Sequence, residues 1–340
     1  MHEKNYCEGY FTGNNIMNRK IAVVGAGYWG KNHVRVSREL GILEIVCDTS
    51  IEILKNIEEK FKGIKTTTDI KEIIQNEKIE GVIVSSPAST HYTLAKKFLL
   101  SGKDVFVEKP LSLKVEEGEE LVEIAEKKGC VLMVGHILHY HPSIVKMKEI
   151  IKNGDIGKIQ YIYSNRLNIG RIRNEENILW SFAPHDISLL LSLIEEMPEN
   201  VFSYGGIYLP HNVEDVTLTF FSFPSGINAH IFVSWLNPFK EQKFVVVGNE
   251  RMIVFDDTQK EKKLTMYSHK INWKDNELPT IEKCKGEIVQ FEDKEPLKEE
   301  IKHFVKCVKE RKKPLTDGKE GLKVLKVLNM AEKSLKRSYQ

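Results

Sequence analysis

Short apolar runs alternate with amphipathic, helix-length segments from residue 20 to residue 134. Apolar runs of this kind are typical of buried strands, and apolar positions three or four residues apart are typical of helices. The pattern predicts strands at 20–24, 43–47, 66–68, 81–84, 104–107 and 130–134, and helices at 31–40, 50–60, 69–76, 89–100 and 115–128. Because the two kinds of element alternate, we expect a Rossmann domain with a doubly wound parallel sheet.

The alternation of strands and helices ends after His141. A helix is predicted at 142–152, a strand at 158–166 and a helix at 180–195, and strands without intervening helices follow at 201–208, 213–223, 227–236, 243–247 and 251–255. We therefore expect a second α/β domain with a mostly antiparallel sheet. Residues 257–294 show no clear period, and helices are predicted at 297–311 and 318–335. The chain is divided into an extension (1–18), the Rossmann domain (19–141) and a C-terminal domain (142–340).

The first strand runs into a glycine-rich turn, Gly25-Ala26-Gly27-Tyr28-Trp29-Gly30, and the second strand ends in Asp48. Gly25 permits the sharp turn, Gly27 lets a pyrophosphate approach the backbone, and Gly30 lets the helix pack closely. The helix N-terminus favours phosphate. Asp48 can accept hydrogen bonds from both ribose hydroxyls and repels a 2′-phosphate, so the turn predicts a site for NAD. The alternative is a glycine turn of another doubly wound fold.

Glu108-Lys109-Pro110 follows a predicted parallel strand, at the sheet edge where open α/β sheets bind ligands. A lysine beside a nicotinamide can hydrogen-bond a substrate hydroxyl and stabilise a developing alkoxide. Lys109 is therefore a candidate catalytic residue. The alternative is a surface lysine at a strand end.

The helix predicted at 180–195 carries a second candidate. Pro184 suits the first turn of a helix. His185 would then lie near the positive end of the helix dipole, which lowers the pKa of an imidazole and keeps it neutral, as a general base requires. The alternative is a capping or buried structural histidine.

A polar loop rich in arginine precedes this helix and contains Arg166, Asn168, Arg171 and Arg173. Arginine forks bind phosphate and carboxylate bidentately, so the loop is a candidate for an anionic substrate. Charged loops are more commonly only solvated, and that alternative stays open.

Three histidines lie close together at His136, His139 and His141. No nearby cysteine or carboxylate completes a ligand set, so no metal site is predicted. His136 follows the last strand of the first sheet and is expected to line the substrate pocket.

Composition excludes some classes of function. The 340 residues carry 50 Lys+Arg and 48 Asp+Glu, a net charge of +2, which gives no bias toward nucleic acid. No apolar run approaches the length of a membrane span, and residues 1–18 lack an apolar signal core. The five cysteines are scattered, without a CxxC pair, which is typical of reduced thiols in a cytoplasmic protein.

The glycine turn, Ser86-Pro87 with His91, and Glu108-Lys109-Pro110, in this order, resemble the Gfo/Idh/MocA oxidoreductase family. The resemblance extends from residue 19 over nearly the whole chain. It implies a second domain built on an open, mostly antiparallel sheet. It also implies that Lys109 and His185 are catalytic, and that Ser86, Pro87, His91 and Glu108 lie along the cofactor. Many members carry aspartate four residues before the histidine; here that residue is Ser181, which puts a carboxylate-assisted base in doubt.

The run from Arg166 to Ser188 is similar to the branch of the family that oxidises UDP-linked N-acetylglucosaminuronic acid at C3. The resemblance implies that the arginine loop binds the carboxylate and diphosphate, with Ser181 and His185 at the sugar. It also implies a role in surface-polysaccharide synthesis, recycling of bound NADH by 2-oxoglutarate, and a homodimer or homotetramer. Rival interpretations are the same chemistry on a free sugar, an inositol or another nucleotide sugar, and an NAD-binding regulator without catalysis.

Overall fold

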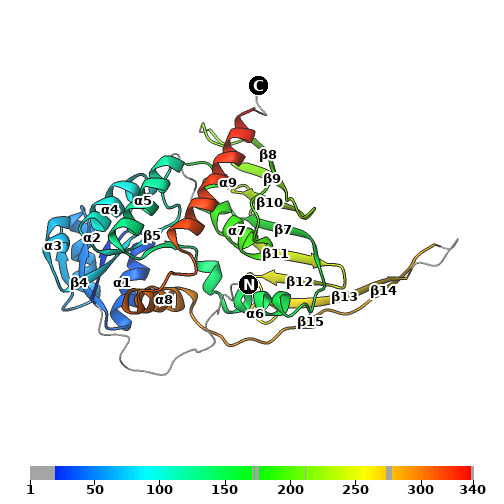
Figure 1. The fold of residues 1–340 in the computed structure, drawn as a ribbon, viewed down its shortest axis with the longest axis horizontal. Coiled ribbons are helices and arrows are strands. Elements are labelled where there is room, and N and C mark those ends of the chain that lie inside the picture. The colour runs from blue at the N-terminus through cyan, green and yellow to red at the C-terminus, as the bar shows by residue number, and fades with distance from the viewer. Residues whose placement is uncertain (1–19, 171, 173–175, 211, 273–277, 338–340) are drawn as a thin grey trace.

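The computed structural model describes residues 20–170, 172, 176–210, 212–272 and 278–337. These residues form two sheets with helices packed against them (Figure 1). The predicted N-terminal extension, residues 1–18, lies outside the described residues.

The first sheet has six strands in the order β3-β2-β1-β4-β5-β6, and every pair is parallel. The strands are β1 (Lys20–Val24), β2 (Leu43–Cys47), β3 (Lys65–Thr67), β4 (Ile79–Val84), β5 (Asp104–Glu108) and β6 (Leu132–Gly135). The predicted doubly wound sheet is confirmed. Its strand order reverses between β1 and β4, and ligands of such sheets bind at the carboxyl ends of the strands on either side of this point.

Five helices connect these strands. They are α1 (Gly30–Glu39), α2 (Ile51–Lys60), α3 (Ile70–Gln75), α4 (Ala88–Leu100) and α5 (Val115–Lys128). The Ser50 hydroxyl and the Asp69 carboxylate accept hydrogen bonds from backbone N–H groups in the first turns of α2 and α3, which fixes where these helices begin. α5 ends at Gly129, which has a φ of 63°.

The second sheet is mixed and mostly antiparallel, as predicted, in the order β14-β13-β12-β11-β7-β10-β9-β8, with β15 paired to β13. Only β7 and β10 pair in parallel among the pairs described. The strands are β7 (Ile159–Leu167), β8 (Asn200–Gly206), β9 (Val216–Ser222), β10 (Asn228–Ser234), β11 (Glu241–Gly248), β12 (Arg251–Asp256), β13 (Leu264–Asn272), β14 (Thr280–Lys283) and β15 (Glu287–Ile288).

The last three of these strands fall in the stretch whose structure the sequence pattern does not predict. In Figure 1, β13 and β14 extend away from the rest of the molecule as an arm. Its apolar side chains are largely exposed, as at Ile271, Leu278 and Ile281. β13 begins against the core, where Leu264 is buried, but its outer part and β14 are not covered, so the sequence there carries no alternation of apolar and polar positions.

The remaining helices are the 3-10 turn η2 (Ile137–Tyr140), α6 (Pro142–Lys152), α7 (Ile178–Ile194), α8 (Pro296–Glu310) and α9 (Gly318–Arg337). α7 packs against the second sheet, and α9 contacts α5, α7 and β8, so it runs between the two units (Figure 1). α8 returns to the first unit: Ile301 and Phe304 share a buried cluster with Ile21 and Phe106. The predicted domain of residues 142–340 does not anticipate this return, and the domain boundaries stay a prediction.

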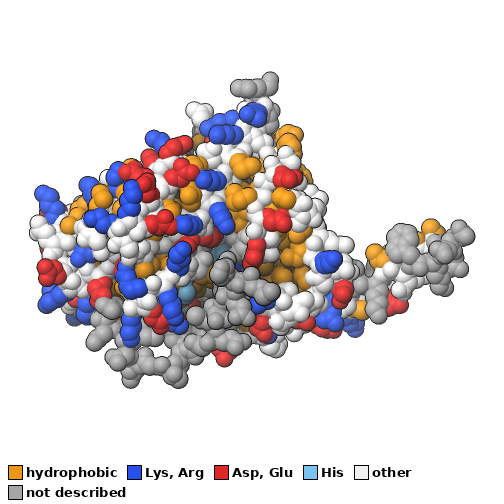
Figure 2. All heavy atoms as spheres, in the orientation of Figure 1, with side chains coloured by type: hydrophobic (Ala, Val, Ile, Leu, Met, Phe, Trp, Pro, Cys, Tyr) orange, Lys and Arg blue, Asp and Glu red, His pale blue; other side chains and the backbone are white. Residues whose placement is uncertain are grey.

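Within the described ranges, no helix is both long enough and apolar enough to cross a membrane. Basic and acidic side chains are interspersed on the face shown in Figure 2, without a field of one sign. This agrees with the near-neutral net charge of the chain.

Candidate active site

The glycine turn joins the carboxyl end of β1 to α1. Gly25 has a φ of 88°, and a Cβ placed on it would lie 2.6 Å from the Ser86 nitrogen. A Cβ on Gly30 would lie 1.9 Å from the Gly25 carbonyl oxygen. A Cβ on Gly27, in contrast, would meet no atom within 4 Å. Gly25 and Gly30 are therefore required by close packing, whereas Gly27 borders open space, and its contact with a pyrophosphate stays a prediction.

Asp48 lies at the carboxyl end of β2 and faces the same turn. Its Oδ2 accepts a hydrogen bond of 2.7 Å from the Ala26 N–H, and its Oδ1 accepts one of 2.9 Å from the Ser50 N–H. The carboxylate thus fixes the glycine turn, a role that the sequence pattern did not reveal. Its predicted contact with a ribose would share the same oxygens and stays a prediction.

Ser86, Pro87 and His91 surround the start of α4. The Ser86 and Thr90 hydroxyls lie 2.6 Å apart, and Pro87 is the residue before the helix. His91 is buried, with its Nδ1 2.7 Å from the Pro110 carbonyl oxygen and its Nε2 2.9 Å from that of Ser86. Its side chain therefore joins two loops at the carboxyl edge of the sheet, and a direct cofactor contact of His91 stays a prediction.

Glu108 ends β5 and is held by two groups from the first turns of α1. Its Oε1 lies 2.6 Å from His33 Nε2 and accepts a hydrogen bond of 2.8 Å from Trp29 Nε1. Burial alone would raise the pKa of Glu108, but the His33 and Trp29 contacts and the charge of Lys109 lower it below its ordinary value. Glu108 is therefore an ionised carboxylate beneath the glycine turn. Tyr28 and the half-exposed Trp29 lie on the outer side of this turn.

Lys109 connects the two units. Its Nζ donates a hydrogen bond of 2.7 Å to the Ser181 carbonyl oxygen in α7. Ser181 is one helical turn before His185. The predicted lysine and histidine are therefore brought together by the meeting of β5 with α7. The Ser181 side chain is buried and supplies no carboxylate to His185.

The start of α7 differs from the prediction. Asn177 caps the helix by accepting a hydrogen bond from the Trp180 N–H, so the helix begins at Ile178 and Pro184 lies inside it rather than in its first turn. His185 is consequently not at a helix N-terminus, and that explanation of its neutral state is wrong. Its pKa is still well below the ordinary value, chiefly because the ring is buried and then because Lys109 and Arg166 are cationic.

Arg166 forms a buried ion pair that the sequence does not indicate. Its Nε and Nη2 donate hydrogen bonds of 2.7 and 3.0 Å to the two carboxylate oxygens of Asp186. Asp186 is 1% exposed and also accepts a hydrogen bond from the Ser164 hydroxyl. Asp186 thus occupies the Nε and Nη2 side of the guanidinium, and a contact of Arg166 with a substrate carboxylate or diphosphate stays a prediction.

The other predicted substrate residues lie at the end of β7 or beyond it. Asn168 is half-buried, and its backbone N–H donates to the Ser234 carbonyl oxygen. Arg171 and Arg173 lie outside the described residues.

His136 lies directly against the proposed base. The His136 ring lies edge-on to that of His185, with centroids 6.0 Å apart, and both of its nitrogens are buried. His139 and His141 point elsewhere, toward Ser188 and Asp257. Among the side chains that the structure describes, no cluster of three or more His, Cys, Asp or Glu residues is arranged to hold a metal ion. Glu320 in α9 also approaches His136, and no local motif marks this residue in the sequence.

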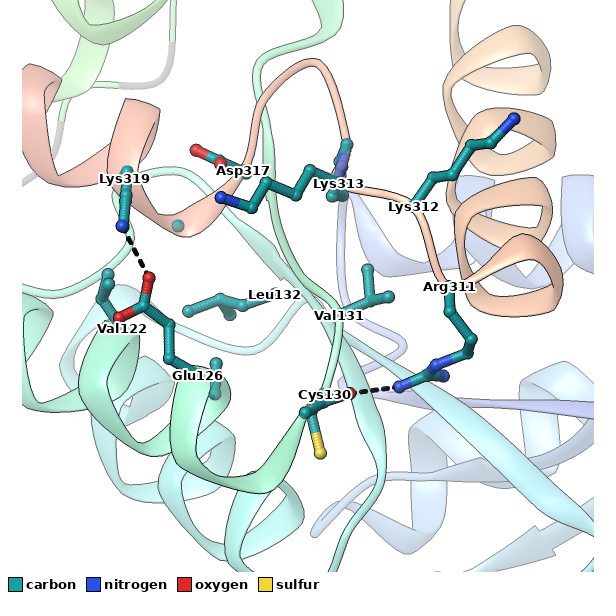
Figure 3. Close-up of a pocket in the computed structure, with 14 residues that line it drawn as sticks. Val122, Glu126, Cys130, Val131, Leu132, Arg311, Lys312, Lys313, Asp317 and Lys319 are labelled. Atoms are coloured by element: carbon teal, nitrogen blue, oxygen red, sulfur yellow. Dashed lines mark hydrogen bonds and ion pairs between the residues drawn. The ribbon is translucent and has the colours of Figure 1, made fainter.

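A separate pocket of about 410 Å³ opens at the amino end of β6, opposite the site. Figure 3 shows Cys130 and Leu132 along it, with Arg311, Lys313 and Lys319 around its rim. Arg311 pairs with Asp104, and Lys319 pairs with Glu126. This pocket holds none of the candidate catalytic residues.

Two family models match this chain, one in each unit. Residues 19–136 match the family model described as "Oxidoreductase family, NAD-binding Rossmann fold", and residues 144–254 match the model of the GFO/IDH/MocA C-terminal domain. Myo-inositol 2-dehydrogenase of Thermotoga maritima is 24% identical over 93% of this chain and 96% of its own length. UDP-N-acetylglucosamine 3-dehydrogenase of Acidithiobacillus ferrooxidans is 21% identical over 91% of this chain and 95% of its own length.

Solved structures show the same fold. The A. ferrooxidans enzyme superposes with a TM-score of 0.82 at 20% identity, covering 94% of this chain and 98% of that one. Levoglucosan dehydrogenase in complex with NADH and levoglucosan superposes with a TM-score of 0.81 at 18% identity, covering 94% and 98%. The predictions of fold, oxidoreductase class and NAD as cofactor are confirmed, and the chain belongs to the Gfo/Idh/MocA oxidoreductase family.

Proposed function

We propose that this chain oxidises the C3 hydroxyl of a UDP-linked N-acetylglucosaminuronic acid to a ketone. NAD, when bound, supplies the hydride acceptor. Residues 25–30 would hold its pyrophosphate, and Asp48 would face its ribose. The observation that supports the proposal is the contact of Lys109 with the Ser181 carbonyl, one helical turn before His185, whose pKa is lowered by burial and by the charge of Lys109.

Each of these two residues has a distinct task in the proposed mechanism. Lys109 holds the substrate oxygen and stabilises its developing negative charge. His185 removes the hydroxyl proton, because its lowered pKa leaves the imidazole neutral and able to accept one. The two cations beside His185, Lys109 and Arg166, also favour an oxygen that becomes negative.

The substrate class is supported by the sequence of the arginine loop and by the kinship with an enzyme named UDP-N-acetylglucosamine 3-dehydrogenase. With Arg166 engaged by Asp186, Arg171 and Arg173 are the remaining arginines proposed to bind the carboxylate and the diphosphate. Synthesis of surface-polysaccharide sugars, recycling of NADH by 2-oxoglutarate, a cytoplasmic location and a homodimer or homotetramer belong to the same proposal.

A second candidate is the oxidation of an inositol. It is favoured by myo-inositol 2-dehydrogenase of T. maritima and by scyllo-inositol 2-dehydrogenase of Bacillus subtilis, which is 27% identical over 87% of this chain and 88% of its own length. A regulator that binds NAD without catalysis is less well supported, because both Lys109 and His185 are retained at the site.

The test offers UDP-N-acetylglucosaminuronic acid, UDP-N-acetylglucosamine, myo-inositol and scyllo-inositol separately to the protein with NAD. NADH absorbance and mass spectrometry of the product are measured, with and without 2-oxoglutarate, so that retained NADH does not hide turnover. Loss of two hydrogens from the uronic acid supports the proposal. Turnover of an inositol alone would support the second candidate, an inositol dehydrogenase. Turnover of none of the four compounds would favour a regulator that binds NAD without catalysis.

A further inference from the structure

Three buried ring nitrogens, one of the proposed base and two of the histidine beside it, have no hydrogen-bond partner among the described residues. They are Nδ1 of His185 and both ring nitrogens of His136. His136 is 1% exposed, and the two rings meet edge-on. Unpaired buried polar atoms are costly, so their retention in adjacent rings calls for a functional explanation.

Glu320 continues this arrangement on the far side of His136. Its Oε2 lies 3.6 Å from His136 Nε2, and its Oε1 accepts a hydrogen bond from the Ser188 hydroxyl. Ser188 is also 2.7 Å from His139 Nε2, and His139 Nδ1 is 2.9 Å from Lys148 Nζ. Glu320 is therefore held in place by a chain of polar contacts that reaches α6.

We propose that His136 and Glu320 form a relay that carries the substrate's hydroxyl proton from His185 away from the site. This inference rests on the proposed dehydrogenase function. In the oxidation, the substrate's C–H bond delivers a hydride to NAD and its O–H bond delivers a proton to His185, so the substrate loses two electrons and the cofactor gains them. The relay moves only the proton: one ring nitrogen of His136 accepts it and the other releases one to the Glu320 carboxylate, and each transfer requires the two groups to close to hydrogen-bond distance from their present separation.

The charges around the relay favour this direction. A protonated His185 would lie beside Lys109 and Arg166, so the proton cannot remain there at low cost. Burial lowers the pKa of His136 to about 3, so this ring can carry the proton only transiently. The pKa of Glu320 is raised to about 7, chiefly by burial and in part by the charge of Asp317. The hydrogen bond from Ser188 and the charges of Lys148 and Lys323 lower this pKa, but they do not offset the effect of burial. Glu320 is thus the member that can hold the proton near neutral pH.

The relay is tested with Glu320→Gln and His136→Asn, and His141→Asn is the matched control. His141 belongs to the same run of histidines but pairs with Asp257, outside the relay. On the substrate identified above, we expect both relay variants to lower kcat by about tenfold or more at neutral pH, with a larger solvent deuterium isotope effect. Glu320→Gln should also remove the inflection of kcat near pH 7, and added imidazole should restore part of the activity of His136→Asn. The control should change none of these.

A second measurement separates failure of the relay from failure of the proposed function. Histidine ring nitrogens are followed by NMR in the full chain without substrate, between pH 5 and pH 9. The His136 signal should inflect near pH 7 as Glu320 ionises, in the wild type and in His141→Asn, but not in Glu320→Gln. If no sugar is oxidised, the proposed function fails and this titration still decides whether the two groups are coupled. Wild-type kcat and isotope effect in both relay variants, or no inflection in the wild type, would overturn the relay.

Discussion

Replacing Asp186 by asparagine tests whether Arg166 is a structural residue or a substrate ligand. The Arg166 side chain is 13% exposed and that of Asp186 is 1% exposed, so the pair is nearly excluded from water. An asparagine in place of Asp186 would retain the side chain's shape but not its charge, and its amide N–H would face the N–H groups of the Arg166 fork. The guanidinium would then be a buried cation without its hydrogen-bonded counter-ion, and Asp257 would act on it only through its charge.

The expected loss of stability is about 3–5 kcal/mol, the cost of removing one partner of a buried ion pair. Most of this loss is the penalty on the remaining charge and not the net value of the pair. A double variant, Arg166→Met with Asp186→Leu, removes both charges and should therefore recover most of the stability.

Urea unfolding followed by circular dichroism measures these differences in the unfolding free energy. Glu126→Gln is the control, because it breaks an ion pair with Lys319 in which both side chains are 55% exposed, and no measurable change is expected. If Asp186→Asn costs under about 1 kcal/mol, while Arg166→Gln raises KM without loss of stability, Arg166 would be a substrate ligand and the structural assignment would be refuted.

Three further predictions concern the site. Lys109→Met and His185→Asn should each lower kcat by about 10²–10⁴-fold with NAD affinity retained; near-normal turnover of either would remove it from the mechanism. Gly27→Ala should fold normally but bind NAD weakly in a fluorescence titration, whereas Gly30→Ala should unfold at lower urea, because its Cβ would overlap the turn. Burial raises the pKa of Glu320 from 4.5 to about 7, so wild-type stability should fall by up to ~3 kcal/mol as pH rises across that interval, and Glu320→Gln should abolish this fall.

The features that the sequence predicted best depend on local patterns. The parallel sheet follows from runs of buried apolar residues, and the glycine turn and Lys109 are placed by the strands that precede them. The sequence also singles out His185 as a candidate base, which stays a prediction, but the helix-dipole explanation of its neutral state is wrong. Pro184 misled the assignment of the helix start because a proline in the first turn and one inside a helix look alike in sequence.

The features that the sequence missed depend on residues that are distant along the chain. Asp186 is adjacent to His185, yet nothing local shows that it pairs with Arg166 on β7. Glu320 reaches His136 only because α9 runs between the two units. The outer part of the arm of β13 and β14 has no buried face, so the period on which strand prediction relies is missing from it.

The return of α8 to the first unit has a consequence for the order in which the protein can fold. Phe304 and Ile301 complete the same core as Ile21 and Phe106, although most of the chain separates the two ends of that cluster. During synthesis, the glycine turn and its strands emerge early, but their core stays open on one side until residues 296–310 have been made. A fragment ending near residue 141 would expose that apolar surface, so the cofactor-binding half depends on nearly the whole chain for its stability.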